Sequence, residues 1–184
     1  MKTATNMVWM DLEMTGLDPH KERIIEVALI VTDKNLNQLD EPIQYVIHQD
    51  DALLQAMDEW NTATHTRTGL IDRVKASHLR EQEVEDALLK YVSAWIPPHK
   101  SPLCGNTIHQ DRRFLRRYMP RLDSYFHYRN IDVSSVKELA LRWKPSILQD
   151  WSKKGAHKAV DDVLESIEAV SYTHLRAHET EADL

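Results

Sequence analysis

The chain contains very little cysteine, glycine and proline. Cys104 is the only cysteine among 184 residues, which excludes a disulfide within the chain and suits a reducing compartment. Four glycines and seven prolines are too few for a collagen-like or other low-complexity chain. The apolar run at residues 7–10 is too short for a signal peptide or a membrane span. We therefore expect a cytoplasmic protein that does not enter a membrane.

Negative charge outnumbers positive charge. The chain has 23 Lys and Arg residues against 29 Asp and Glu residues, which gives a formal net charge of −6 at pH 7. Proteins that hold long nucleic acids by the backbone are usually basic, so this balance argues against a binder of long duplexes. It leaves open a protein that acts on very short nucleic acids, especially if bound cations neutralise part of the acidic charge. The 42% hydrophobic and 28% charged composition fits one globular domain with a sizeable core.

The hydrophobic pattern predicts an α/β fold. Residues 8–15 alternate between apolar and other side chains, and residues 24–32 and 43–48 are rich in β-branched residues, so we expect three strands in an antiparallel meander. Two more short strands are expected at residues 103–105 and 128–133. Helices are expected at residues 50–60, 66–74, 77–95, 111–119, 134–143 and 159–170, with Ser77 and Ser134 as N-caps. This order predicts a mixed sheet flanked by helices.

Four carboxylates in three separate segments carry the functional signal. Asp11 and Glu13 lie two residues apart on the first expected strand, so both side chains project from one face. Asp111 begins a helix, and Asp162 follows His157 by five residues. Divalent cations such as Mg²⁺ and Mn²⁺ prefer oxygen ligands, and a pair of them can drive phosphodiester cleavage. A histidine near the cluster could act as a base, because its unperturbed pKa is about 6.5.

Each segment also has a simpler interpretation. Asp11 and Glu13 could be the solvent face of an amphipathic strand, and Asp111 could be a helix N-terminal carboxylate favoured by the dipole. His157 is one of 10 histidines and could lie on the surface. The spacing does not say whether Asp161 or Asp162 is the ligand.

Taken together, the segments resemble the Exo I, Exo II and Exo III motifs of the DEDDh exonucleases. Those motifs read Asp-x-Glu, Asn followed by Asp, and His with a carboxylate five positions on. Longer stretches resemble the oligoribonucleases within that superfamily; they are residues 9–19, 104–106, 110–114, 118–120, 125–129, 132–134, 137–140 and 142–145. The resemblance implies a ribonuclease-H-like fold, with a five-stranded sheet of three antiparallel strands followed by parallel strands. It also implies a homodimer that is a 3′-to-5′ exoribonuclease, which degrades short single-stranded RNA, dinucleotides especially, to 5′-mononucleotides.

The resemblance assigns roles residue by residue. The metal ligands for two ions, Mg²⁺ or Mn²⁺, would be Asp11, Glu13, Asp111 and Asp162, and the catalytic general base would be His157. Leu17 and Trp60 would pack on the substrate bases, and Thr107 and Ser134 would contact the phosphate at the closed end of the pocket. Tyr128, as a second catalytic residue, and Arg129, as a substrate-binding residue, would reach an active site near the dimer interface, that of the partner subunit.

Two departures from the family pattern stand out. Position 107 is Thr where the family mostly carries Ser, which keeps the hydroxyl and adds a methyl group. Residues 1–170 form the expected exonuclease domain, whereas residues 171–184 lack the apolar periodicity of the family's last helix. We interpret that segment as a poorly packed tail that is not the native end. Two rival functions remain: a DEDDh exonuclease that acts on DNA, such as a polymerase proofreading subunit, and a binding module that has lost catalysis.

Overall fold

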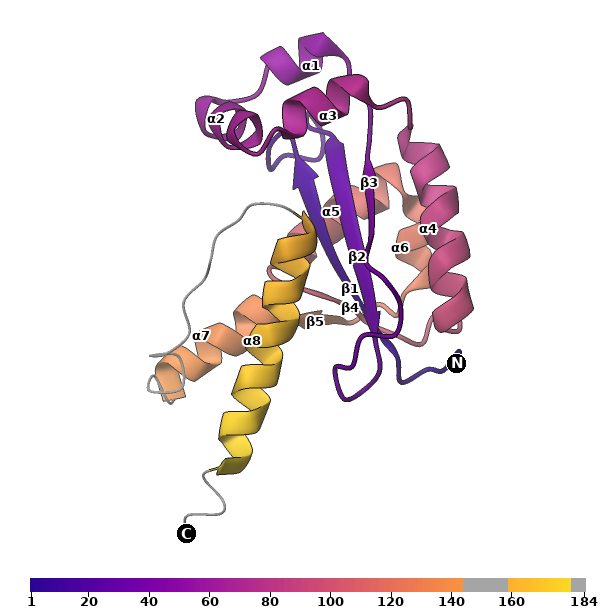
Figure 1. The fold of residues 1–184 in the computed structure, drawn as a ribbon, viewed down its shortest axis with the longest axis vertical. Helices are drawn as coiled ribbons and strands as arrows, with labels where there is room; N and C mark the ends of the chain where they lie inside the picture. The colour runs from indigo at the N-terminus through magenta and orange to yellow at the C-terminus, as the bar shows by residue number, and fades with distance from the viewer. Residues whose placement is uncertain (144–158, 180–184) are drawn as a thin grey trace.

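A computed structural model describes the backbone of residues 1–143 and 159–179, and the side chains of these residues up to position 171. A mixed sheet lies at the centre of the described part (Figure 1). Its strands are β1 (Met7–Met14), β2 (Ile24–Thr32), β3 (Ile43–Val46), β4 (Leu103–Gly105) and β5 (Asn130–Asp132), in the order β3-β2-β1-β4-β5. The first three strands pair antiparallel, whereas β4 pairs parallel with β1 and with β5. The predicted five-stranded α/β sheet is therefore confirmed.

Helices cover both faces of this sheet. They are α1 (Asp51–Gln55), α2 (Glu59–Arg67), α3 (Leu70–Ala76), α4 (Glu81–Trp95), α5 (Ile108–Tyr118), α6 (Pro120–Tyr125), α7 (Val133–Trp143) and α8 (Ala159–Glu179). Helices α4, α5 and α6 pack on one face, α8 packs on the other, and α1 to α3 lie at one end (Figure 1). No helix in the described ranges is both long and apolar enough to cross a membrane.

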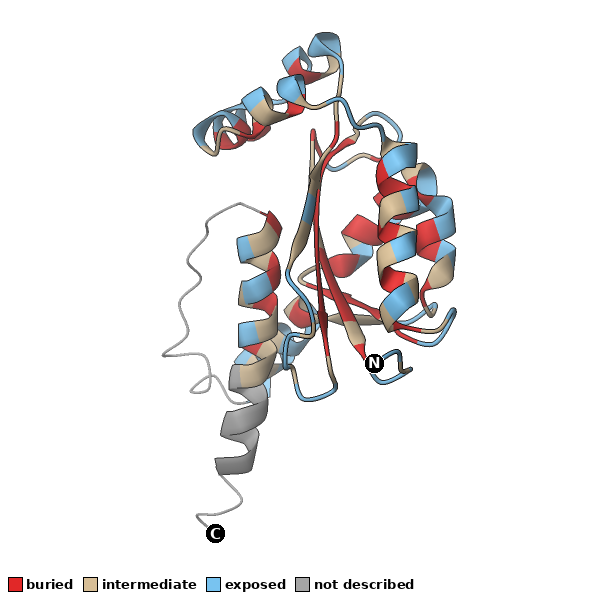
Figure 2. Cartoon of the chain, turned by 45° about the vertical axis from the view of Figure 1, so that its right-hand side comes forward, coloured by how far each residue is buried: buried red, intermediate tan, exposed pale blue. Residues whose placement is uncertain are grey.

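The alternation of side chains along β1 decides which residues reach the functional face. Val8, Met10 and Leu12 belong to the core under α4 and α5, whereas Trp9 belongs to the smaller core under α8. Since successive strand residues point to opposite faces, Asp11 shares the α8 face with Trp9, as does Glu13 two residues on. Figure 2 shows the buried strands between these two helical layers.

Gly105, at the end of β4, allows a close approach to β1. A Cβ atom at this position would lie 2.5 Å from the backbone oxygen of Met10 and 2.8 Å from Cδ1 of Ile108, so a larger residue would collide with the strand. The glycine thus lets the following turn, Asn106 and Thr107, lie against β1.

Several predicted helix boundaries are wrong. Three helices, α1 to α3, stand where two were expected. Ser77 is the C-cap of α3 and does not begin α4, and its hydroxyl donates to the Val46 carbonyl oxygen at 2.6 Å. Pro120 begins α6, since proline suits the first turn of a helix as well as it stops one.

Two expectations near the C-terminal end are also wrong. Ser134 lies inside α7, where Asp132 accepts the hydrogen bond from its backbone N–H at 3.0 Å. The last helix does not end at residue 170, because α8 continues to Glu179. How the side chains beyond position 171 pack lies outside the described residues.

Candidate active site

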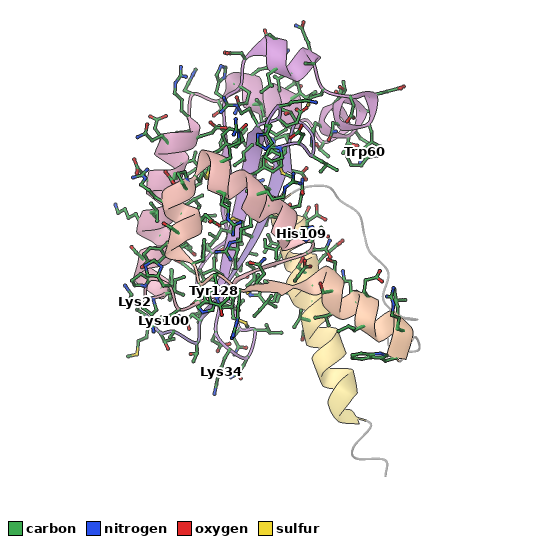
Figure 3. The ribbon with its side chains drawn as sticks, turned by 180° about the vertical axis from the view of Figure 1, so that it is seen from behind. Lys2, Lys34, Trp60, Lys100, His109 and Tyr128 are labelled. Atoms are coloured by element: carbon green, nitrogen blue, oxygen red, sulfur yellow. The ribbon has the colours of Figure 1, made fainter. Side chains whose placement is uncertain are left out.

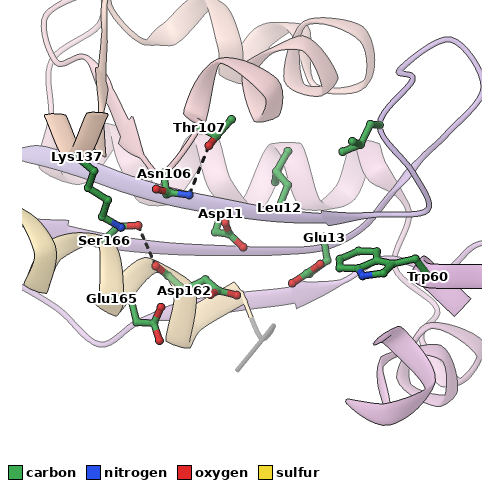
Figure 4. Close-up of a pocket in the computed structure, with 11 residues that line it drawn as sticks. Asp11, Leu12, Glu13, Trp60, Asn106, Thr107, Lys137, Asp162, Glu165 and Ser166 are labelled. Carbon is green, nitrogen blue, oxygen red and sulfur yellow. Dashed lines mark hydrogen bonds between the residues drawn. The ribbon is translucent and has the colours of Figure 1, made fainter. Parts of the chain in front are cut away.

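Three of the predicted ligands converge on one point. Asp11 and Glu13 project from β1, and Asp162 projects from the first turn of α8. Each contributes one oxygen to a group in which all the atoms lie within 4.8 Å of one another. The close-up in Figure 4 shows the three carboxylates turned toward the same space. Helix α8 brings Asp162 here because its buried residues Ala159 and Val163 pack under β1 and β2.

Asp111 lies directly behind this group. Its side chain is buried, and Oδ1 accepts a hydrogen bond from the backbone N–H of Leu12, the residue between Asp11 and Glu13, at 2.9 Å. Burial raises the pKa of Asp111 to about 7, with a further contribution from the nearby charge of Asp132, and the Leu12 N–H opposes the shift. Asp111 is outside the group of oxygens that lie within 4.8 Å, so it abuts the cluster without joining it.

The donor set fits a hard divalent cation. Three carboxylates at this spacing repel one another unless a positive charge lies between them, and all three are only partly exposed to water. Oxygen-only ligands favour Mg²⁺ or Mn²⁺ over zinc. The adjacent Asp161 is exposed and is not part of the group, which identifies Asp162 as the inward carboxylate.

The cluster forms the floor of a cavity of about 400 Å³. Leu17, at the turn after β1, and Trp60, in the first turn of α2, line it, with 70% and 63% of their surfaces exposed. Large exposed apolar side chains beside a polar floor are suited to contact a flat ring, such as a nucleic-acid base. Asp58 fixes the start of α2, because its side chain accepts the hydrogen bond from the Asn61 N–H.

Thr107 and Ser134 meet at the other end of the cavity. Their hydroxyl oxygens lie 3.2 Å apart, and the Thr107 backbone N–H donates to Ser134 Oγ at 3.1 Å. Thr107 lines the cavity, together with Asn106 and Lys137, whereas Ser134 stands behind Thr107 and is not among the lining residues. The structure therefore brings the two predicted phosphate contacts together but leaves only one of them at the cavity wall.

Tyr128 and Arg129 lie away from this cavity in their own chain. Tyr128 is 72% exposed, stacks on His127 with 4.3 Å between ring centroids, and lines a separate hollow with Arg116. The Arg129 guanidinium lies 5.5 Å from the Tyr128 ring. In Figure 3, Tyr128 and Trp60 lie well apart, with His109 between them. His157, the predicted base, lies outside the described residues.

Three residues near the cluster were not predicted from the sequence. Glu165 and Lys137 line the cavity, and among its described lining residues Lys137 carries the positive charge. His65 is buried in α2; its Nδ1 lies 4.0 Å from Glu13 Oε2, and its Nε2 lies 3.0 Å from the Met14 carbonyl oxygen. Glu165 could have been found from its position one turn after Asp162. No local pattern distinguishes His65 or Lys137.

The mixed sheet and the converging carboxylates fit the ribonuclease-H-like class, and the family comparison identifies the chain as an exonuclease. The RNase T model, whose description is exonuclease, matches residues 8–170. An oligoribonuclease from Neisseria meningitidis serogroup C is 56% identical over 97% of this chain and 94% of its own length. An oligoribonuclease from Klebsiella pneumoniae is also 56% identical, over 91% of this chain and 92% of its own length. The chain belongs to the oligoribonuclease family of exonucleases.

A solved structure shows the same fold at much lower identity. A complex of E. coli exonuclease I with single-stranded DNA is 18% identical, with a TM-score of 0.74 over 94% of this chain. The chain spans 41% of that exonuclease, so the likeness concerns the shared domain.

Proposed function

We propose that this chain is a 3′-to-5′ exoribonuclease that degrades short single-stranded RNA, dinucleotides especially, to 5′-mononucleotides. The observation that carries the proposal is the convergence of Asp11, Glu13 and Asp162 at the floor of a cavity whose rim carries Leu17 and Trp60. The oligoribonuclease relatives support the choice of short RNA as substrate.

The carboxylates would hold two divalent cations, Mg²⁺ or Mn²⁺, with Asp111 completing the set. Bound there, the cations would supply Lewis-acid stabilisation of the charge that develops on the scissile phosphate. Asp11, near the centre of β1, would hold a cation together with Glu13 and Asp162. The protein's contribution is to keep these oxygens on rigid elements, a strand and two helices.

His157 would act as the general base. A neutral imidazole accepts a proton near pH 7, so it can take the proton of the attacking water. The motif spacing to Asp162 supports this role.

The ends of the cavity would set the substrate length. Leu17 and Trp60 would pack on the bases. Such packing does not depend on the base sequence, because every base has a flat face. Thr107 and Ser134, with Arg129, would close the cavity behind the 5′ phosphate and exclude longer chains. Since Arg129 and Tyr128 lie away from the cavity in their own chain, we propose that they act in the partner's site of a homodimer in the cytoplasm.

A cleavage assay with 5′-labelled di-, tri- and heptaribonucleotides tests the proposal. With Mg²⁺ or Mn²⁺, the heptamer should give a descending ladder and the dimer should be consumed fastest, whereas chelator and Asp11→Asn should stop both reactions. Immediate release of the label from the heptamer would indicate the opposite direction. Equal or faster cleavage of matched deoxyoligonucleotides would favour the DNA exonuclease instead.

A further inference from the structure

Asp132, the last residue of β5, is not one of the Exo motif residues, yet its carboxylate accepts several hydrogen bonds. Its Oδ1 accepts from the Thr107 N–H at 3.0 Å, the Ser134 N–H at 3.0 Å and the Ser134 hydroxyl at 2.6 Å. Its Oδ2 lies 3.2 Å from Nδ1 of His109. Burial alone would raise the pKa of Asp132, but the hydrogen bonds from Ser134, His109 and Thr107 outweigh burial and lower it, so the carboxylate is ionised near neutral pH.

The residue that Asp132 holds is in an uncommon conformation. Thr107 has φ 54° and ψ 29°, in the left-handed region, which a β-branched residue rarely adopts. Such a conformation persists only where neighbouring contacts fix it. Here the Thr107 N–H is shared between Asp132 Oδ1 and Ser134 Oγ, which ties the turn after β4 to the start of α7.

We propose that Asp132 is a positioning residue for the 5′ end of the substrate, which keeps the Thr107 hydroxyl at the cavity wall by clamping Thr107 and Ser134 together. The inference rests on the proposed function, because it assigns the end of the cavity near Thr107 to the 5′ phosphate.

The direction of the hydrogen bonds explains how the clamp works. The Thr107 hydroxyl donates to Ser134 Oγ, and the Ser134 hydroxyl donates to Asp132. When a phosphate oxygen enters, the Thr107 hydroxyl can turn its proton from Ser134 toward that oxygen. Ser134 stays in place, because Asp132 still accepts from its backbone and its hydroxyl. Ser134 therefore acts from behind Thr107, which agrees with its absence from the cavity lining.

Hydrogen bonds offset part of the repulsion between Asp132 and an incoming phosphate, because protein groups engage both of its oxygens. Lys137, at the wall of the same cavity, adds a positive charge on the substrate side.

The test compares dinucleotides with and without a 5′ phosphate. The measured quantity is the ratio of kcat/KM for the 5′-phosphorylated dinucleotide to kcat/KM for the 5′-hydroxyl dinucleotide. We expect wild type to prefer the phosphorylated substrate. In Asp132→Ala that ratio should fall about tenfold, mostly through KM, which corresponds to about 1.4 kcal/mol. Asp132→Asn should keep part of the ratio, because its amide oxygen can still accept from the two N–H groups.

A matched control is available at Glu85 in α4. This carboxylate is also buried and also accepts backbone N–H groups at a helix start, those of Arg121 and Leu122, far from the cavity. Glu85→Gln should lower the melting temperature without changing the substrate ratio.

The outcomes separate the inference from the proposed function. An unchanged kcat/KM ratio in Asp132→Ala overturns the positioning role. If that variant does not fold, an unchanged ratio in Asp132→Asn overturns the role instead. A wild type that cleaves both substrates equally well overturns the role together with the phosphate pocket, while the nuclease assignment survives. A wild type that cleaves neither overturns the proposed function itself.

Discussion

Replacing Asp162 by Asn should stabilise the metal-free protein and weaken its response to divalent cations. The oxygens of Asp11, Glu13 and Asp162 lie within 4.8 Å of one another, so each fully ionised pair repels by at least about 3.5 kcal/mol at an effective dielectric constant of about 20. The substitution removes two of the three pairs. Partial protonation and solvent screening reduce this, and we expect a net gain of about 1–2 kcal/mol in chelator.

The assay is thermal unfolding at pH 8, followed by circular dichroism, with chelator or with Mn²⁺. For a chain of this size, about 1–2 kcal/mol corresponds to a rise in Tm of roughly 2–8 °C for Asp162→Asn in chelator. Wild type should gain more from Mn²⁺ than the variant does, because only the wild-type cluster offers three carboxylates. The order of the two melting temperatures should therefore reverse when Mn²⁺ is added.

Asp161→Asn is the matched control. It removes the same charge from the neighbouring residue, whose side chain is exposed and lies outside the cluster. It should leave both melting temperatures nearly unchanged. The reasoning is refuted if Asp162→Asn lowers Tm in chelator, or if it responds to Mn²⁺ as fully as Asp161→Asn does.

Three further predictions concern catalysis, binding and pH. His157→Ala should lower turnover on a dinucleotide by about 100-fold or more at unchanged Tm; near-normal turnover of the folded variant would remove His157 from the role of base. Trp60→Ala should raise KM for dinucleotides by about 5- to 150-fold, the loss of one stacked base, and an unchanged KM would exclude stacking. Burial raises the pKa of Asp111 to about 7, above its value in the unfolded chain, so the folded state binds the extra proton and metal-free stability should fall as pH rises from 5 to 8. Asp111→Asn should flatten that slope, and a parallel slope in the variant would contradict the assignment.

The central fold follows from local patterns. Alternation along residues 8–15 predicts β1 and places Asp11 and Glu13 on one face, and the β-branched run predicts the fully buried β2. Helix boundaries were harder to predict where one residue type serves two purposes. Pro120 can end or begin a helix, and the Ser77 hydroxyl binds the Val46 carbonyl instead of capping α4.

The sequence predicts which residues belong to the candidate site better than it predicts how they are arranged. The motif resemblance selects Asp11, Glu13, Asp111 and Asp162, and three of them do share a space. The positions of His65 and Lys137 depend on how α2 and α7 pack against the sheet, which no local spacing encodes. The same holds for Asp132, which reaches Thr107 only because β5 pairs in parallel with β4, in a register that sets Asp132 beside Gly105.

The most direct test of the carboxylate site is anomalous diffraction from crystals of the protein grown with Mn²⁺ and a non-cleavable dinucleotide. The account predicts manganese peaks bounded by the carboxylates of Asp11, Glu13 and Asp162, with the scissile phosphate against them. A substrate bound in the cavity with no manganese among these oxygens would contradict it.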